Sequence, residues 1–104
     1  MSSVRVCSLA DLPDGTARKV DVDGEPVALV RIGERIMAVA DTCSHAEVSL
    51  SEGEVVVDEC AIECWKHGSL FSLETGEALT LPATQPVIVF TARIEGDDIM
   101  VDER

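Results

Sequence analysis

Three short apolar segments separated by tight-turn dipeptides constrain the fold of this chain more than any other feature. They lie within residues 17–43, ARKVDVDGEPVALVRIGERIMAVADTC, and are rich in β-branched residues. The dipeptides Asp23-Gly24 and Gly33-Glu34 are typical of two-residue hairpin turns. This segment therefore predicts a meander of three antiparallel strands.

The rest of the chain repeats this rhythm of short strands and turns. Strands are expected at 54–57, 61–64, 70–73, 87–94 and 99–102, with turn signals at Thr75-Gly76 and Gly96-Asp97. A short segment around residues 8–12 is expected to be helical. Because 104 residues are enough for one small core but not for two, we predict a single all-β domain over residues 1–104.

The charge of the chain limits its partners. Twenty acidic and eight basic side chains give a net charge of -12, which repels nucleic acid and anionic membranes and is compatible with steering toward basic partners or with solubility alone. No apolar run has the length of a signal peptide or a membrane span, so a cytoplasmic protein is expected. In that reducing compartment the four cysteines are expected to be metal ligands or core residues rather than disulfides.

Both histidines of the chain stand beside a cysteine, where predicted strands end. CSHAEVSL (43–50) contains Cys43 and His45, and CWKHG (64–68) contains Cys64 and His67. Two thiolates and two imidazoles can hold a tetrahedral zinc ion or an iron–sulfur cluster. Each loop offers one ligand of each kind, which favours a dinuclear centre with one iron on the cysteines and one on the histidines. A zinc-stabilised binding module stays open as an alternative.

The pattern Cys-x-His, eighteen residues, then Cys-x-x-His-Gly resembles the Rieske 2Fe-2S motif, and the resemblance extends through HGSLFSLETGEAL and LPATQP. It implies a Rieske-like fold of antiparallel β-sheets, a sandwich or incomplete barrel. It also implies a small cluster-binding subdomain of two loops, at approximately 42–86, and one Rieske-type 2Fe-2S cluster. The implied ligands are Cys43, His45, Cys64 and His67.

Departures from the membrane-anchored Rieske subunits indicate the branch of the family. Val48 and Lys66 stand where those proteins carry the two cysteines of a disulfide. Phe71 replaces a tyrosine whose hydroxyl donates a hydrogen bond to a cluster sulfur. Ser69 matches their serine donor. Rieske potentials span about -150 to +300 mV and depend partly on such hydrogen bonds. With one donor missing and carboxylates nearby, we expect a potential at the low end; these carboxylates are Glu47, Glu52, Glu54 and Glu63.

The chain has no further histidine for a mononuclear oxygenase iron and no nicotinamide or flavin fingerprint. The resemblance therefore implies a soluble Rieske ferredoxin, an electron-transfer component rather than an enzyme. It would carry single electrons from an NAD(P)H-dependent flavin reductase to a terminal aromatic-ring-hydroxylating (di)oxygenase, as a monomer that docks transiently. An accessory Rieske protein of another redox enzyme or of iron–sulfur assembly is the alternative.

Four residues near the predicted ligands have expected roles in shielding the cluster, contacting a partner or shaping the loops. Trp65 either shields the cluster from water or anchors a partner, and Lys66 is either solvated or pairs with a partner carboxylate. Gly68 is expected to supply a backbone shape that a side chain would block. Pro82 is expected to stiffen the loop that covers the cluster.

The two remaining cysteines are expected to be inert core residues. Cys7 belongs to the first predicted strand. Cys60 is assigned to the strand that leads to Cys64, on the same face as Ile62.

Overall fold

A computed structural model describes residues 3–43, 48–66, 68–81 and 85–102 of the chain. Within these residues the secondary structure consists of short β-strands and three 3-10 helices, and it contains no α-helix. The helices are η1 (Leu9–Asp11), η2 (Leu50–Glu52) and η3 (Val57–Glu59). The strands are β1 (Ser3–Ser8), β2 (Ala17–Val22), β3 (Glu25–Ile32), β4 (Arg35–Ala40), β5 (Val55–Val56), β6 (Ala61–Glu63), β7 (Leu70–Ser72), β8 (Val89–Phe90), β9 (Ala92–Glu95) and β10 (Asp98–Asp102).

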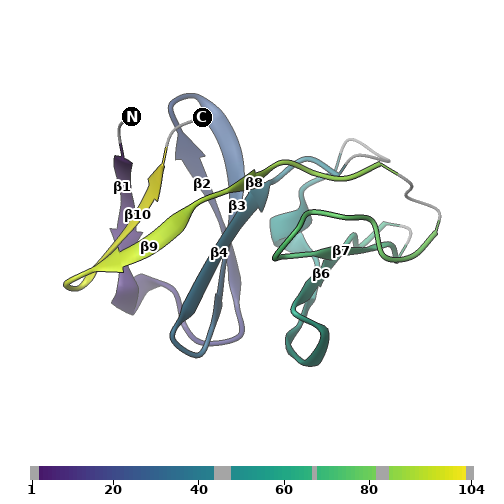
Figure 1. The fold of residues 1–104 in the computed structure, drawn as a ribbon, viewed down its shortest axis with the longest axis horizontal. Coiled ribbons are helices and arrows are strands. Elements are labelled where there is room, and N and C mark those ends of the chain that lie inside the picture. Colours follow the sequence, from purple (N-terminus) through teal and green to yellow (C-terminus); the bar gives the residue numbers. More distant parts are fainter. Residues whose placement is uncertain (1–2, 44–47, 67, 82–84, 103–104) are drawn as a thin grey trace.

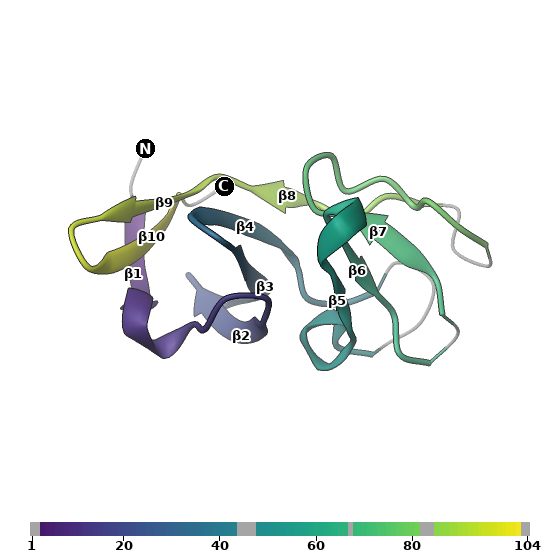
Figure 2. The ribbon, with the colours of Figure 1, turned by 90° about the horizontal axis from the view of Figure 1, so that it is seen from below.

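The strands form three antiparallel sheets. The central sheet has the order β2-β3-β4-β8, and a second sheet has the order β1-β10-β9. These two sheets lie on the left in Figure 1, and the third sheet, β5-β6-β7, forms a lobe beside them. Figure 2 shows the same division from below, with β8 running from the lobe toward β9.

The central sheet separates two hydrophobic cores. Successive residues of a strand point to opposite faces, and β3 carries the fully buried run Val27–Val30. Val27 and Leu29 belong to the core shared with β1 and β10, whereas Ala28 and Val30 belong to the core shared with the lobe. Burial on both faces explains why β3 is a continuous apolar run rather than an alternating one.

The structure confirms the all-β fold class and the predicted meander. β2, β3 and β4 pair in antiparallel register across turns at Asp23-Gly24 and Gly33-Glu34. The helical segment expected around residues 8–12 is the single 3-10 turn η1.

Apart from shifts of one or two residues at strand ends, two sequence-based expectations differ from the structure. The strand expected over 87–94 is split at Thr91, because β8 pairs with β4 while β9 leaves that sheet and pairs with β10. The assignment of Cys60 to a strand is wrong. Cys60 caps η3 in the left-handed conformation, with φ 50° and ψ 52°, and β6 begins only at Ala61.

Among the described residues, no helix has the length and apolarity needed to cross a membrane.

Candidate metal centre

The first Cys-His loop follows the end of β4 and closes on itself. Thr42 forms an isolated antiparallel bridge with Ser49. One residue further along, the Cys43 N–H donates to the Val48 carbonyl at 3.0 Å. Cys43 therefore lies at the base of the loop, held by main-chain hydrogen bonds. His45, the second predicted ligand of this loop, lies outside the described residues.

The second Cys-His loop joins β6 to β7 and is closed in the same way. Glu63 pairs with Leu70, and the Cys64 N–H donates to the Ser69 carbonyl at 2.7 Å. The Gly68 N–H returns to the Cys64 carbonyl at 2.8 Å, and Gly68 has a φ of +74°. Residues with a side chain rarely adopt this conformation, which supports the expectation for Gly68. His67 lies outside the described residues.

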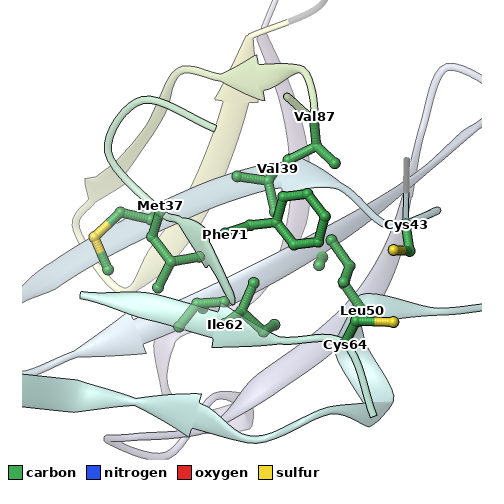
Figure 3. Packing of buried hydrophobic residues seen from close by; sticks show 11 residues of the cluster. Met37, Val39, Cys43, Leu50, Ile62, Cys64, Phe71 and Val87 are labelled. Atoms are coloured by element: carbon green, nitrogen blue, oxygen red, sulfur yellow. The ribbon is translucent and has the colours of Figure 1, made fainter. Parts of the chain in front are cut away.

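The two loops are structurally equivalent at their bases. In each, the cysteine N–H donates to the carbonyl of the residue five positions later. Cys43 is 4% exposed and Cys64 is 0% exposed, and both belong to the core shared by the central sheet and the lobe. Figure 3 shows their sulfur atoms at one end of this core, away from Met37. The structure thus brings the two predicted cysteine ligands to the same place.

This pair of thiols fits a soft metal centre. All four cysteines are present as thiols rather than disulfides, and a thiolate suits iron–sulfur clusters and zinc. Within the described ranges, no group of three or more His, Cys, Asp or Glu side chains could hold a metal ion. The two predicted histidine ligands are not among these residues.

The predicted neighbours of the centre divide into buried and exposed groups. Ser69 and Phe71 are fully buried, and Phe71 packs in the same core as both cysteines. Trp65 is 53% exposed and Lys66 is also exposed. This exposure favours the partner-anchor role of Trp65 over the shielding role. Pro82 lies outside the described residues.

The carboxylates named in the prediction of a low potential lie mostly on the surface. Glu52 and Glu54 are exposed and Glu63 is half-buried, while Glu47 is outside the described residues. Lys66 is the only Lys or Arg of the sequence between Arg35 and Arg93. The second loop therefore presents one cation on an otherwise acidic stretch of chain.

The other two cysteines lie away from this pair. Cys7 is buried in the core between the central sheet and β1-β10-β9. Cys60 packs against the core between the central sheet and the lobe, with its Sγ 3.8 Å from Met37 Sδ. Burial raises the pKa of both the Cys7 and the Cys60 thiols. A raised pKa keeps a thiol protonated and unreactive, which agrees with the predicted inertness of both residues. Cys7 is a buried core residue as expected, whereas Cys60 is only half-buried.

Sequence reasoning missed two residues that hold the loops. Asp41 is a buried carboxylate two residues before Cys43, and its only sequence signal is an acidic residue at the end of an apolar strand. Gly53 lies against the Glu63 carbonyl, where a Cβ would come within 1.7 Å of the oxygen. Nothing in the sequence around Gly53 indicates this long-range contact, since any turn glycine would look the same.

Comparisons with known proteins agree with the fold and the paired loops. Residues 2–91 match the family described as the Rieske [2Fe-2S] domain. The chain is 39% identical, over 102 residues, to the 3-phenylpropionate/cinnamic acid dioxygenase ferredoxin subunit of Shigella boydii serotype 4, covering 98% of this chain and 94% of the relative.

Solved structures agree with this match. The ferredoxin of carbazole 1,9a-dioxygenase from Nocardioides aromaticivorans IC177 superposes with a TM-score of 0.96 at 35% identity, over 100% of both chains. A chain of the complex of reduced oxygenase and oxidized ferredoxin in carbazole 1,9a-dioxygenase superposes with a TM-score of 0.87 at 37% identity, over 95% of this chain and 91% of that one.

These matches confirm the predicted family resemblance, the Rieske-like fold and the Rieske-type 2Fe-2S cofactor. The individual ligand residues stay a prediction, supported by the placement of the two cysteines. With a family match over residues 2–91 and full-length similarity to ferredoxins, the chain belongs to the Rieske [2Fe-2S] domain family.

Proposed function

We propose that this protein is a soluble ferredoxin that delivers single electrons to the terminal oxygenase of an aromatic-ring-hydroxylating dioxygenase system. The observation that carries the proposal is the full-length similarity to ferredoxin components of such systems, with TM-score 0.96 for one of them. The two equivalent loops, each with a buried cysteine at its base, supply the structural support. The protein acts as an electron carrier and leaves the oxidation of the substrate to its partner.

We infer that Cys43 and Cys64 bind one iron and that His45 and His67 bind the other, within a cluster-binding part formed by about residues 42–86. A 2Fe-2S cluster, when bound, takes up and releases one electron. The chain's own contribution is to fix the ligands. Main-chain hydrogen bonds hold each cysteine at a loop base, and burial keeps water from the thiols.

The exposed side of the second loop is our candidate contact for both partners. Trp65 projects into solvent, and Leu79 and Leu81 are exposed on the segment that follows β7. Leu79 is held beside the second loop because its N–H donates to the Leu70 carbonyl at 2.7 Å. Exposed aromatic and aliphatic side chains near a redox centre suit brief docking with little buried area. A monomer in the cytoplasm fits this use, with an NAD(P)H-dependent flavin reductase as the electron donor.

Reconstitution tests the proposal. The purified protein is mixed with NADH and with the reductase and oxygenase components of a characterised aromatic dioxygenase, and hydroxylated product is measured with and without this chain. We expect product only when the chain is present, and none with His67→Ala because one predicted ligand is removed. Equal product from the wild type and His67→Ala would refute the ligand assignment. A protein that contains zinc and no iron would establish the binding-module alternative instead.

A further inference from the structure

Asp41 is the buried carboxylate that the proposed function leaves unexplained. It follows β4 directly and is 1% exposed. Its carboxylate Oδ1 accepts a hydrogen bond from the Ser51 N–H at 2.9 Å. Its main-chain carbonyl accepts one from the Leu50 N–H at 2.6 Å, and its own N–H donates to the Pro26 carbonyl of β3 at 3.1 Å. One residue thus joins the central sheet to the segment on the far side of the first loop.

We propose that Asp41 is a positioning residue that holds both cluster-binding loops in the geometry their ligands need. The inference rests on the proposed ligand set. It assigns Asp41 no contact with the cluster. Its role is to fix the main chain from which Cys43, and indirectly Cys64, present their thiols.

A series of contacts closes the first loop. Asp41 bonds Leu50 and Ser51, Thr42 bridges Ser49, and Cys43 bonds Val48. These consecutive contacts pair the two sides of the loop, and the contacts of Asp41 are the ones nearest the central sheet. Losing the side-chain hydrogen bond of Asp41 leaves the half-buried Ser51 N–H without its acceptor. This loss costs more free energy than the loss of an exposed hydrogen bond.

Contacts through η2 link Asp41 to the other loop. Leu50 and Ser51, the residues that Asp41 holds, belong to η2. The Gly53 N–H closes this turn on the Leu50 carbonyl at 2.9 Å, and Gly53 itself lies against the Glu63 carbonyl. Glu63 is the residue before Cys64. A displacement of η2 therefore reaches the base of the second loop.

Packing supports the same connection. Leu50 is fully buried and belongs to the same core cluster as Cys43 and Cys64, as Figure 3 shows. Because protein cores are close-packed and transmit small shifts, the position of η2 affects both cysteines. Asp41 holds η2 from the side of the central sheet.

The burial of a carboxylate here is informative in itself. Burying a charge is unfavourable unless hydrogen bonds compensate it. No buried side-chain nitrogen or oxygen atom of the described residues lacks a hydrogen-bond partner. The proposed role of the buried carboxylate is to select one arrangement of η2, as buried polar groups do in some proteins.

Two substitutions separate the hydrogen bond from the charge. Asp41→Asn keeps an Oδ1 acceptor for Ser51 and removes the charge, whereas Asp41→Ala removes the acceptor. Asp21→Ala is the matched control, because Asp21 Oδ1 also accepts a main-chain N–H, from Gly24 at 2.8 Å, but at the exposed β2–β3 turn rather than in a loop that carries a cysteine ligand. If Asp41→Ala does not yield folded protein, Asp41→Glu takes its place, because it keeps the charge and displaces the acceptor by one methylene group.

The test measures the loss of visible absorbance during chelator challenge, the EPR spectrum of the dithionite-reduced protein and the thermal midpoint. We expect Asp41→Ala, or Asp41→Glu in its place, to lose the cluster about tenfold faster than the wild type, because the half-buried Ser51 N–H is left without its acceptor. Its EPR features should also broaden or shift. Asp41→Asn and Asp21→Ala should keep the wild-type loss rate and spectrum.

Two failures are distinguishable. A wild-type protein without the mixed sulfur–nitrogen EPR signal would refute the proposed function itself. A normal wild-type signal with an Asp41→Ala protein that matches Asp21→Ala in loss rate and spectrum would overturn the positioning role. A thermal midpoint that falls while the cluster signal and its loss rate do not change would overturn the positioning role as well.

Discussion

Replacing Gly53 with alanine places a methyl group where the structure has no room for one. The added Cβ would lie 1.7 Å from the Glu63 carbonyl oxygen, and real Cβ atoms essentially never approach closer than 3.0 Å. The two segments must therefore separate by about 1.3 Å. Because Glu63 donates to the Glu54 carbonyl and immediately precedes Cys64, the separation strains β5–β6 pairing and moves the base of the second loop.

The sign of the stability change is informative. Gly53 has a φ of -86°, which any residue adopts, so alanine at an uncrowded site would stabilise the protein by about 0.4–1 kcal/mol through the unfolded state. Overpacking against a fixed backbone costs about 1–3 kcal/mol. We expect a net destabilisation of about 1–2 kcal/mol and a fall in Tm on the order of 5–10 °C.

Circular dichroism melts and the EPR spectrum of the reduced protein measure the two effects. Gly33→Ala is the control, because Gly33 has a φ of +62° and nothing within 4 Å of an added Cβ. It should lower Tm through backbone strain in the β3–β4 turn while leaving the EPR spectrum unchanged. A Gly53→Ala protein with a Tm equal to or above the wild type would refute the close contact with Glu63.

Individual contacts lead to three further predictions. The Ser3 hydroxyl and the Arg93 guanidinium lower the pKa of Asp102 below its usual value, so the stability that the ionised Asp102 contributes is present above the unfolded pKa and is lost as pH falls through the folded pKa. In urea titrations, the stability of Asp102→Asn should therefore fall less than that of the wild type as pH is lowered below about 5. Equal losses in the two proteins would contradict the assignment. Phe71→Tyr should raise the reduction potential in spectroelectrochemistry if its hydroxyl bonds the cluster, and an unchanged or lowered potential would count against the predicted cause of the low value. Iodoacetamide should label half-buried Cys60 before buried Cys7, as peptide mass mapping can follow, and equal rates would contradict their different exposure.

Local patterns were sufficient to predict much of the fold. Turn dipeptides and β-branched runs identified β2, β3 and β4, because a hairpin depends on neighbouring residues. The break at Thr91 was not predictable in this way, since the switch of partner from β4 to β10 depends on contacts with distant strands. Cys60 was misassigned for a related reason. Alternation in the sequence suggests a strand, but a left-handed cap ends η3 there.

The sequence predicts the ligand residues of the site better than the contacts that hold its two loops in place. Spacing and residue type identified the two Cys-His pairs, and the structure brings Cys43 and Cys64 into one core. The supporting contacts of Asp41 and Gly53 are made with residues ten positions further along the chain, Ser51 and Glu63. Such contacts leave no periodic pattern, so only the folded chain reveals them.

The most direct test of the account is the EPR spectrum of the dithionite-reduced protein, taken together with iron, sulfide and zinc analysis of the same sample. We expect two irons and two inorganic sulfides per chain, with a signal typical of mixed sulfur and nitrogen ligation that is lost in both His45→Ala and His67→Ala. A colourless protein with one zinc, or a cluster signal that survives in both histidine variants, would contradict the central claim.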